Sequence, residues 1–140
     1  MLIDVHGHIG SVVPNPLEFI DVTNLLAKMD HWGIDRSVVL ALSEHPEGAY
    51  LHSDTEDVIT ACSRYPERLI PFCLIDPRFG NHPEMDFSYL LEEYRSRGCK
   101  GIGEFLPKLN FNDPLCINLY KQAAKFDFPV LFDMNDSVYS

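Results

Sequence analysis

The sequence has few basic residues, no long apolar run and no closely spaced pair of cysteines, and each shortage excludes a class of protein. Its 11 Lys and Arg residues face 21 Asp and Glu residues, and the formal net charge of −10 disfavours binding to nucleic acid or to anionic membranes. Its apolar runs are strand-sized, and the first residues have neither the basic nor the apolar region of a signal peptide, so we expect no signal peptide and no membrane span. We therefore expect a cytoplasmic protein with no nucleic-acid and no membrane partner.

The four cysteines, Cys62, Cys73, Cys99 and Cys116, form no Cys-x-x-Cys pair. Each lies among apolar neighbours in a segment with the pattern of a helix or strand. Buried free thiols are therefore expected, rather than disulfides or soft-metal ligands. The sequence also lacks the Gly-x-Ser-x-Gly elbow of serine hydrolases and a Walker A phosphate loop.

With 140 residues and a hydrophobic content of 46%, the chain is long enough for one folded domain over residues 1–140. Five β-branched or aliphatic runs are predicted to be strands, and segments with helical apolar spacing separate them. The predicted strands are Leu2–His6, Arg36–Leu42, Leu69–Ile75, Cys99–Phe105 and Phe128–Phe132. This order predicts an α/β fold with a parallel sheet.

Proline and polar residues indicate where the helices begin. Asn15-Pro16 and Asp113-Pro114 each fit an N-cap followed by proline, and Ser53 with Glu56 fits a capping box. The predicted strand-to-helix loops are longer than the helix-to-strand turns, so the long loops gather at the C-terminal ends of the strands. Proteins of the α/β class place their sites at this end.

Two closed folds fit this order. A (β/α)₈ TIM barrel needs roughly 250 residues, so the chain would be a partial TIM barrel with about five of its eight strands. A five-stranded doubly wound sheet, as in flavodoxin-like binding modules, needs a final helix over its last strand. A partial barrel leaves its sheet edges open, which predicts a homo-oligomer or a complementing chain that covers the open sheet edge.

The segment His6-Gly7-His8 is the sharpest candidate for chemistry. Residues two apart on an extended strand point to the same side, so both imidazoles could bind one metal ion at the C-terminal end of the first strand. Gly7 would let the backbone approach closely, and Asp4 could orient a ligand.

Two carboxylates follow later strands. Glu104 ends the Gly101-x-Gly103-Glu104 segment of the fourth predicted strand, where it could bind metal or act as a general base. The alternative is a solvated ion pair with Lys100. Asp133 follows the fifth predicted strand, at a position where a metal ligand could lie, although acidic residues also form turns there.

Further polar residues lie in loops on the same face and could contact a substrate, although loop polarity alone also explains them. They are Glu44, His45, His52, Asp76 and Arg78. Asp136 follows Asp133 in the loop after the fifth predicted strand, where it could equally be a turn residue. His31 and His82 are expected at a helix end and at a loop start, away from the site.

The chain resembles the amidohydrolase superfamily, in its amidohydrolase-related branch of metal-dependent (β/α)₈-barrel hydrolases and decarboxylases. The resemblance covers essentially the whole chain and rests on four segments: Ile3–His8, Phe72–Pro77, Gly98–Glu104 and Pro129–Phe132. It implies that the chain corresponds to the N-terminal portion of such a barrel.

Residue by residue, the resemblance implies that His6 and His8 bind a divalent metal, usually zinc, with Glu104 as a ligand or neighbour. Family members commonly have histidine at the position of Asp133, so a carboxylate would replace that ligand and shift the preference toward manganese or iron. The implied reaction is hydrolysis of a C–N or C–O bond of a small-molecule substrate, with Glu104 and Asp133 as catalytic carboxylates. A decarboxylase or lactonase, and a non-catalytic half-barrel that acts as an assembly subunit, are the alternatives.

Overall fold

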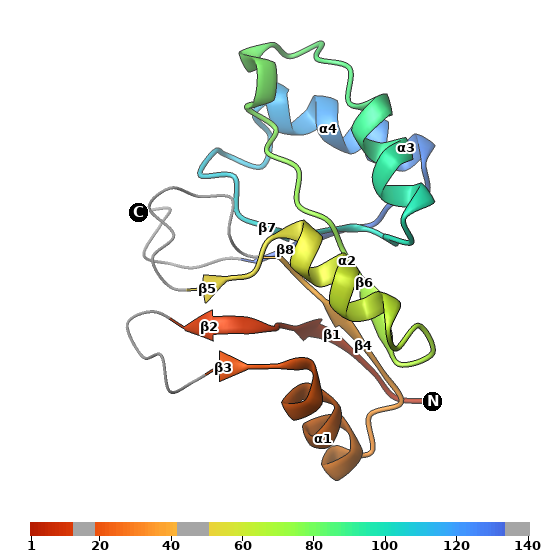
Figure 1. Ribbon diagram of the computed structural model, residues 1–140. Coiled ribbons are helices and arrows are strands. Elements are labelled where there is room, and N and C mark those ends of the chain that lie inside the picture. Colours follow the sequence, from red (N-terminus) through yellow and green to blue (C-terminus); the bar gives the residue numbers. More distant parts are fainter. Residues whose placement is uncertain (13–18, 42–50, 134–140) are drawn as a thin grey trace.

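Five parallel strands alternate with helices in the computed structural model, which describes residues 1–12, 19–41 and 51–133 (Figure 1). The parallel strands are β1 (Ile3–Gly7), β4 (Arg36–Val39), β6 (Leu69–Pro71), β7 (Ile102–Phe105) and β8 (Val130–Phe132). The helices are α1 (Val22–Trp32), α2 (Thr55–Ser63), α3 (Ser88–Ser96) and α4 (Pro114–Lys125), with a 3₁₀ helix η1 (Phe79–Asn81) before α3. The predicted α/β order is confirmed, and no helix among the described residues is long and apolar enough to cross a membrane.

The parallel strands lie beside one another in the order in which they occur in the chain. β1 pairs with β4, β4 pairs with β6, and β7 pairs with β8. A parallel bridge between Cys73, two residues after the end of β6, and Ile102, the first residue of β7, connects the two groups of strands. Sequential order is that of a (β/α)₈ barrel, whereas a flavodoxin-like sheet has its second strand outside its first. The partial TIM barrel is therefore confirmed, and the doubly wound alternative is wrong.

A second, antiparallel sheet was not predicted from the sequence, which indicated loops in this region. It consists of β2 (Gly10–Val12) between β3 (Phe19–Ile20) and β5 (Leu51–His52). β2 begins shortly after β1 ends, so this small sheet lies at the C-terminal end of β1 (Figure 1).

Alternate residues of the parallel strands pack in different surroundings. Val39, at the end of β4, and Ala41, two positions later, share one buried cluster with α1 and α2. This cluster contains Leu25, Met29, Val39, Ala41, Val58 and Cys62. The alternating residues pack in a separate cluster of Val38, Leu40 and Phe72, against which Ile70 and Leu131 are partly buried. We call the helix-covered side the outer face of the sheet and the other side its inner face, as in a barrel.

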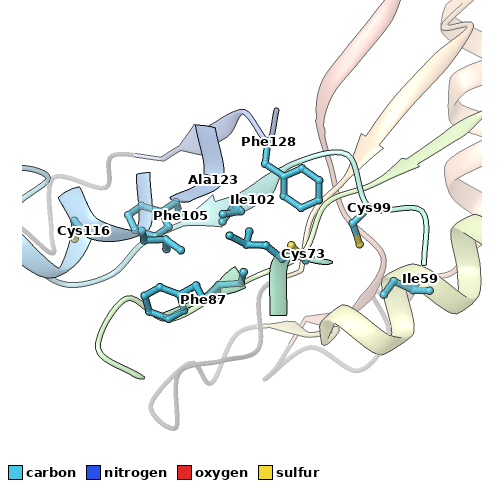
Figure 2. Close-up of a cluster of buried hydrophobic side chains, with 12 residues drawn as sticks. Ile59, Cys73, Phe87, Cys99, Ile102, Phe105, Cys116, Ala123 and Phe128 are labelled. Carbon is cyan, nitrogen blue, oxygen red and sulfur yellow. The ribbon is translucent and has the colours of Figure 1, made fainter. Parts of the chain in front are cut away.

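The largest buried cluster packs α3 and α4 against the outer face of β7 (Figure 2). Its members are Ile59, Cys73, Ile75, Phe87, Leu91, Cys99, Ile102, Phe105, Cys116, Leu119, Ala123 and Phe128. Gln122 of α4 fastens the segment that leads into α3, because its Oε1 accepts a hydrogen bond from the Phe87 backbone N–H at 2.7 Å. All four cysteines are free and buried, as predicted.

The capping box of α2 lies one residue later than predicted. Asp54 and Asp57 form it, rather than Ser53 and Glu56. The Asp54 side chain accepts from the Asp57 N–H at 2.8 Å, and the Asp57 side chain accepts from the Asp54 N–H at 3.3 Å. Two carboxylates at this end also interact favourably with the helix dipole, which a serine hydroxyl cannot do as strongly.

The start of α4 is confirmed, with Asp113 as N-cap and Pro114 in the first turn. α1 begins at Val22, and its N-cap is Asp21, whose side chain accepts from the Asn24 N–H at 2.7 Å. The predicted start at Asn15-Pro16 lies outside the described residues.

Candidate metal centre

Two imidazoles and one carboxylate meet at the C-terminal ends of β1 and β7. His6 Nε2 and His8 Nε2 each lie 3.3 Å from Oε2 of Glu104. The imidazole ring centres are 4.9 Å apart, with an angle of 71° between the ring planes. The ligand atoms of the three residues all lie within 4.8 Å of one another. One metal ion could contact all three side chains at this spacing.

The three side chains differ in their access to solvent. The side chain of Glu104 is 5% exposed, that of His8 is 19% exposed and that of His6 is 42% exposed. The carboxylate therefore forms the buried side of the cluster, and His6 forms its open side. Because Glu104 faces the histidines and is buried, the alternative of a solvated pair with Lys100 is wrong.

An irregularity in β1 lies directly before the histidines. Asp4 pairs with Ser37, and the next pair is Gly7 with Val39, so three steps along β1 match two steps along β4. One extra residue in a strand is a β-bulge, which bends the strand and re-aims the side chains that follow. In a regular strand every second residue after Asp4 would point to the same face of the sheet as Asp4.

This bulge determines which face the histidines occupy. With strict alternation, His6 and His8 would share the face of Asp4, which is the outer face because Asp4 pairs with Ser37. Ile9 instead belongs to the outer cluster with α1 and α2. His8 precedes Ile9 and therefore points inward, and its Nδ1 lies 3.2 Å from the Leu40 backbone oxygen. The bulge thus transfers the histidine pair to the inner face.

A second irregularity in β7 does the same for the carboxylate. Ile102 pairs with Val130 and Phe105 pairs with Phe132, so β7 also contains one extra residue. Ile102 and Phe105 both belong to the outer cluster with α3 and α4. With strict alternation Glu104 would share the outer face of Ile102; the extra residue turns Glu104 toward the histidines instead.

The hydrogen-bonding capacity of His8 fits a cation at this point. A backbone oxygen can only accept, so the contact of His8 Nδ1 with the Leu40 oxygen requires a proton on Nδ1. In the neutral ring, Nε2 then directs a lone pair toward an oxygen of Glu104. Two acceptors at 3.3 Å repel each other unless a proton or a metal cation interacts with both. The nitrogen and oxygen donors suit a divalent first-row metal.

Glu104 is ionised at neutral pH. Burial of its carboxyl raises the pKa, but hydrogen bonds with His8 and Asp133 and the positive charges of His8 and His6 outweigh burial and lower the pKa to about 2. The cluster therefore contains one full negative charge within a largely buried setting. Such a charge favours a bound cation.

Asp133 follows β8, is partly buried, and is in hydrogen-bond contact with Glu104. It is not a member of the group of ligand atoms within 4.8 Å. The structure thus brings the second predicted carboxylate next to the three-residue cluster, on the Glu104 side.

The other polar candidates make local contacts. Asp76 and Arg78 pair with each other, with Arg78 Nη2 2.7 Å from Asp76 Oδ2. His31 and His82 interact within their own segments, as expected of residues away from the site. Glu44, His45, Asp136 and the side chain of His52 lie outside the described residues.

Asp4 contacts the cluster in a way that the sequence did not predict. It binds the backbone of His6 rather than an imidazole, because its Oδ1 accepts from the His6 N–H at 3.1 Å. Its Oδ2 accepts from the Ser37 hydroxyl at 3.1 Å. Ser37 was missed altogether; the available signal was one hydroxyl directly before the apolar run Val38–Leu42 of the predicted strand.

Sequence comparison and structural comparison give different results. No protein-family model matches this chain, and no curated protein matches it. A probable 2-pyrone-4,6-dicarboxylic acid hydrolase from Acinetobacter baumannii, solved with citric acid bound, matches with a TM-score of 0.66 and 18% identity over 98% of this chain and 51% of that chain. A 5-carboxyvanillate decarboxylase from Novosphingobium aromaticivorans, in complex with manganese and 4-hydroxy-3-methoxy-5-nitrobenzoic acid, matches with a TM-score of 0.65 and 15% identity over 93% and 49%.

An uncharacterized TIM-barrel protein from Bordetella bronchiseptica matches with a TM-score of 0.68 and 13% identity over 98% of this chain and 56% of that chain. The chain therefore spans about half the length of the solved structures that it matches. At these identities the matches define the fold, which is about half of a TIM barrel. They confirm, at the level of fold, the resemblance to amidohydrolase-related barrel enzymes.

Proposed function

We propose that residues 1–140 form one domain, the N-terminal portion of a metal-dependent hydrolase barrel that acts on a C–N or C–O bond of a small molecule. The observation that carries this proposal is the convergence of His6 Nε2 and His8 Nε2 on one oxygen of Glu104. His6, His8 and Glu104 would be protein ligands of a divalent metal. Their position at the C-terminal ends of the strands supports the proposal, because barrel enzymes have their active sites there.

The three residues would supply two neutral nitrogen ligands and one negative charge. A divalent metal bound there would act as a Lewis acid toward carbonyl and water oxygens. Glu104 would stay charged there because a bound cation favours the ionised form of a neighbouring carboxyl. We propose zinc as the metal. Manganese and iron are the alternatives, because carboxylate ligands shift the preference toward harder ions. Manganese is present in the solved decarboxylase that shares the fold.

Asp133 would be the second catalytic carboxylate. A hydrogen bond between two carboxyl groups needs one proton, which Asp133 supplies while Glu104 is ionised. With a metal bound to Glu104, Asp133 at the edge of the cluster could lose that proton and be a further ligand, or take a proton from water. Both roles need a carboxylate at this position, but only the first predicts a loss of metal affinity when the charge is removed.

The substrate would be a small molecule. The solved structures that share the fold include a probable hydrolase of a pyrone dicarboxylic acid and a decarboxylase of a carboxylated aromatic acid. Lactones and amides are therefore the first substrates to assay for hydrolysis, and carboxylated aromatic acids are the first for decarboxylation. The net charge of −10 argues against nucleic-acid and anionic-membrane partners, and we propose a cytoplasmic location.

Metal content tests the proposed site directly. Protein purified without a histidine tag should contain close to one zinc, manganese or iron per chain by inductively coupled plasma mass spectrometry. In a His6→Ala/His8→Ala variant the content should fall to about a tenth or less, because two of three ligands are gone. A His31→Ala/His82→Ala variant removes the same number of imidazoles away from the cluster and should retain the metal.

Metal-free wild-type protein that stays metal-free after incubation with each of the three ions would contradict the proposed metal site. Equal metal content in both double variants would contradict the assignment of His6 and His8. Loss of lactone or amide hydrolysis on chelation, with recovery on addition of the metal, would support the proposed reaction.

An assembly subunit is the second candidate, and exposed apolar residues in the edge strand β1 and directly before it favour this candidate. Leu2 is 54% exposed and Val5 is 57% exposed, and Phe132 on the other edge strand, β8, is 43% exposed. Edges of this kind pair with further strands. We propose a homo-oligomer or a complementing chain that covers these edges.

The oligomeric state tests this candidate. Light scattering during size-exclusion chromatography should give a stable oligomer that dissociates in a Leu2→Lys/Val5→Lys variant and is indifferent to chelator. An Ile117→Lys variant, at an exposed position in α4, is the control for added charge. A monomer at micromolar concentration would contradict self-association.

A further inference from the structure

The side chain of Asp4 makes a hydrogen bond to the backbone within the β1 bulge, which lies between Asp4 and Gly7. The ladder resumes after the bulge, where the Leu40 N–H donates to the Gly7 oxygen at 2.9 Å. Within the bulge, the His6 N–H donates to Asp4 Oδ1 at 3.1 Å. The Asp4 carboxylate therefore binds a backbone N–H inside the bulge, in a side-chain-to-backbone contact of the kind that Asp makes in turns.

Ser37 on the neighbouring strand holds this carboxylate in place. Ser37 is fully buried, and its hydroxyl lies 3.1 Å from Asp4 Oδ2 and 3.3 Å from the Val38 backbone oxygen. A hydroxyl has one proton, and a bond to a charged carboxylate is stronger than a bond to a neutral carbonyl. The hydroxyl thus fixes one carboxylate oxygen, and the other is left to accept from His6.

Gly7 provides the space for this contact. A Cβ at Gly7 would lie 2.6 Å from the Ser37 hydroxyl oxygen and 3.0 Å from the Val38 backbone oxygen. Any side chain at this position would push the hydroxyl away from Asp4. The close packing of the Ser37 hydroxyl against β1 therefore explains why a glycine lies between the two histidines.

We propose that Asp4 and Ser37 are a positioning pair that stabilises the β1 bulge and thereby holds His6 on the inner face, opposite Glu104. The inference rests on the proposed metal site for its purpose, although the geometry of the pair does not depend on a metal. Neither residue touches the reacting atoms. Both act through the backbone of His6, and their removal should loosen the imidazole rather than delete a ligand.

The test compares Ser37→Ala and Asp4→Ala with Asp4→Asn and with Thr55→Val as a matched control. Thr55 is a buried residue whose hydroxyl oxygen accepts from the Leu74 N–H at 3.1 Å, so its loss should cost similar stability away from the cluster. Affinity for zinc and for manganese is measured by competition with a chromophoric chelator. In metal-free protein, NMR measures the exchange protection of the His6 amide and the cross-relaxation between the His6 and His8 rings.

We expect Ser37→Ala to weaken metal binding about 10-fold and Asp4→Ala about 10- to 100-fold, as for other groups that orient ligands. Asp4→Asn should recover most of the affinity and of the His6 amide protection, because its amide oxygen can still accept from the His6 N–H. Thr55→Val should bind metal like the wild type. The two alanine variants should also lose the ring-to-ring signal.

Unchanged affinity, amide protection and ring-to-ring signal in both alanine variants would overturn the proposal. So would an equal loss of affinity in Thr55→Val, which would indicate a general effect of stability. If wild-type protein binds neither metal, the proposed function fails, and the two NMR readouts on metal-free protein still decide whether the pair positions His6.

Discussion

Replacement of Glu104 by glutamine should weaken metal binding about 1000-fold while the protein stays folded. Zinc sites contribute on the order of 10–16 kcal/mol of binding free energy. Loss of one of three ligands, and of the only full negative charge among the three, should remove about 4 kcal/mol of that, which is about 1000-fold in affinity. Glu104→Gln keeps the size of the side chain but removes a charge that its neighbours stabilise, so the free energy of unfolding in urea should fall, while circular dichroism should still show a folded protein. Chelator competition measures the change in affinity.

Two further variants make this result specific. Glu92→Gln removes an exposed carboxylate that pairs with Arg95, and it should bind metal like the wild type. Asp133→Asn tests the two roles of the second carboxylate. Unchanged affinity with lost hydrolysis indicates a proton acceptor, whereas a loss of affinity comparable to that of Glu104→Gln indicates a further ligand. If Glu104→Gln binds metal as tightly as wild type, Glu104 is not a ligand.

The candidate site could be predicted from the sequence as a set of residues but not as a geometry. His6, His8 and Glu104 were identified because imidazole and carboxylate groups can bind metals and because all three lie at the C-terminal ends of predicted strands, where α/β proteins have their sites. Strict alternation, however, would have put His8 on the outer face with Asp4. The two bulges that correct this have only a weak sequence signal, since a glycine inside a strand can indicate a bulge or merely a close backbone approach.

The fold was predictable where the hydrophobic pattern was long. The five parallel strands appear because each lies in an apolar run, although the observed strands are shorter: the run Leu69–Ile75, for example, contains β6 of only Leu69–Pro71. The antiparallel strands β2, β3 and β5 have two or three residues each, which is too short for a period of two to appear. Their pairing depends on contacts between distant segments, which local pattern does not encode.

Gly101 is the residue at which the fold and the site depend most directly on the absence of a side chain. A Cβ there would lie 2.5 Å from two ring carbons of Phe72 and 2.8 Å from the Pro129 backbone oxygen. The ring is buried on the inner face, and the Pro129 oxygen is held by the Ile102 N–H at 2.9 Å. Neither neighbour can move away without loss of packing or of a strand hydrogen bond.

Gly101→Ala should therefore lower the free energy of unfolding by about 3 kcal/mol, the upper end of the usual cost of overpacking. Domains of this size are stable by only about 5–15 kcal/mol, so the loss should be plain in urea unfolding followed by circular dichroism. Gly103→Ala is the graded comparison. Its Cβ would meet Leu131 at 3.1 Å and Leu40 at 3.2 Å, contacts that small shifts can relieve, and a cost of about 1 kcal/mol is expected.

A second substitution identifies the cause of the loss. Phe72→Leu removes the ring atoms that a Cβ at Gly101 would meet, so Gly101→Ala should cost about 1 kcal/mol less in the Phe72→Leu background than in wild type. The rescue should be partial, because the contact with the Pro129 oxygen remains. Additive effects of the two substitutions would show that the ring does not restrict this position. Since β7 carries Glu104 three residues after Gly101, the same variant should also weaken metal binding, and the two losses should be relieved together by Phe72→Leu.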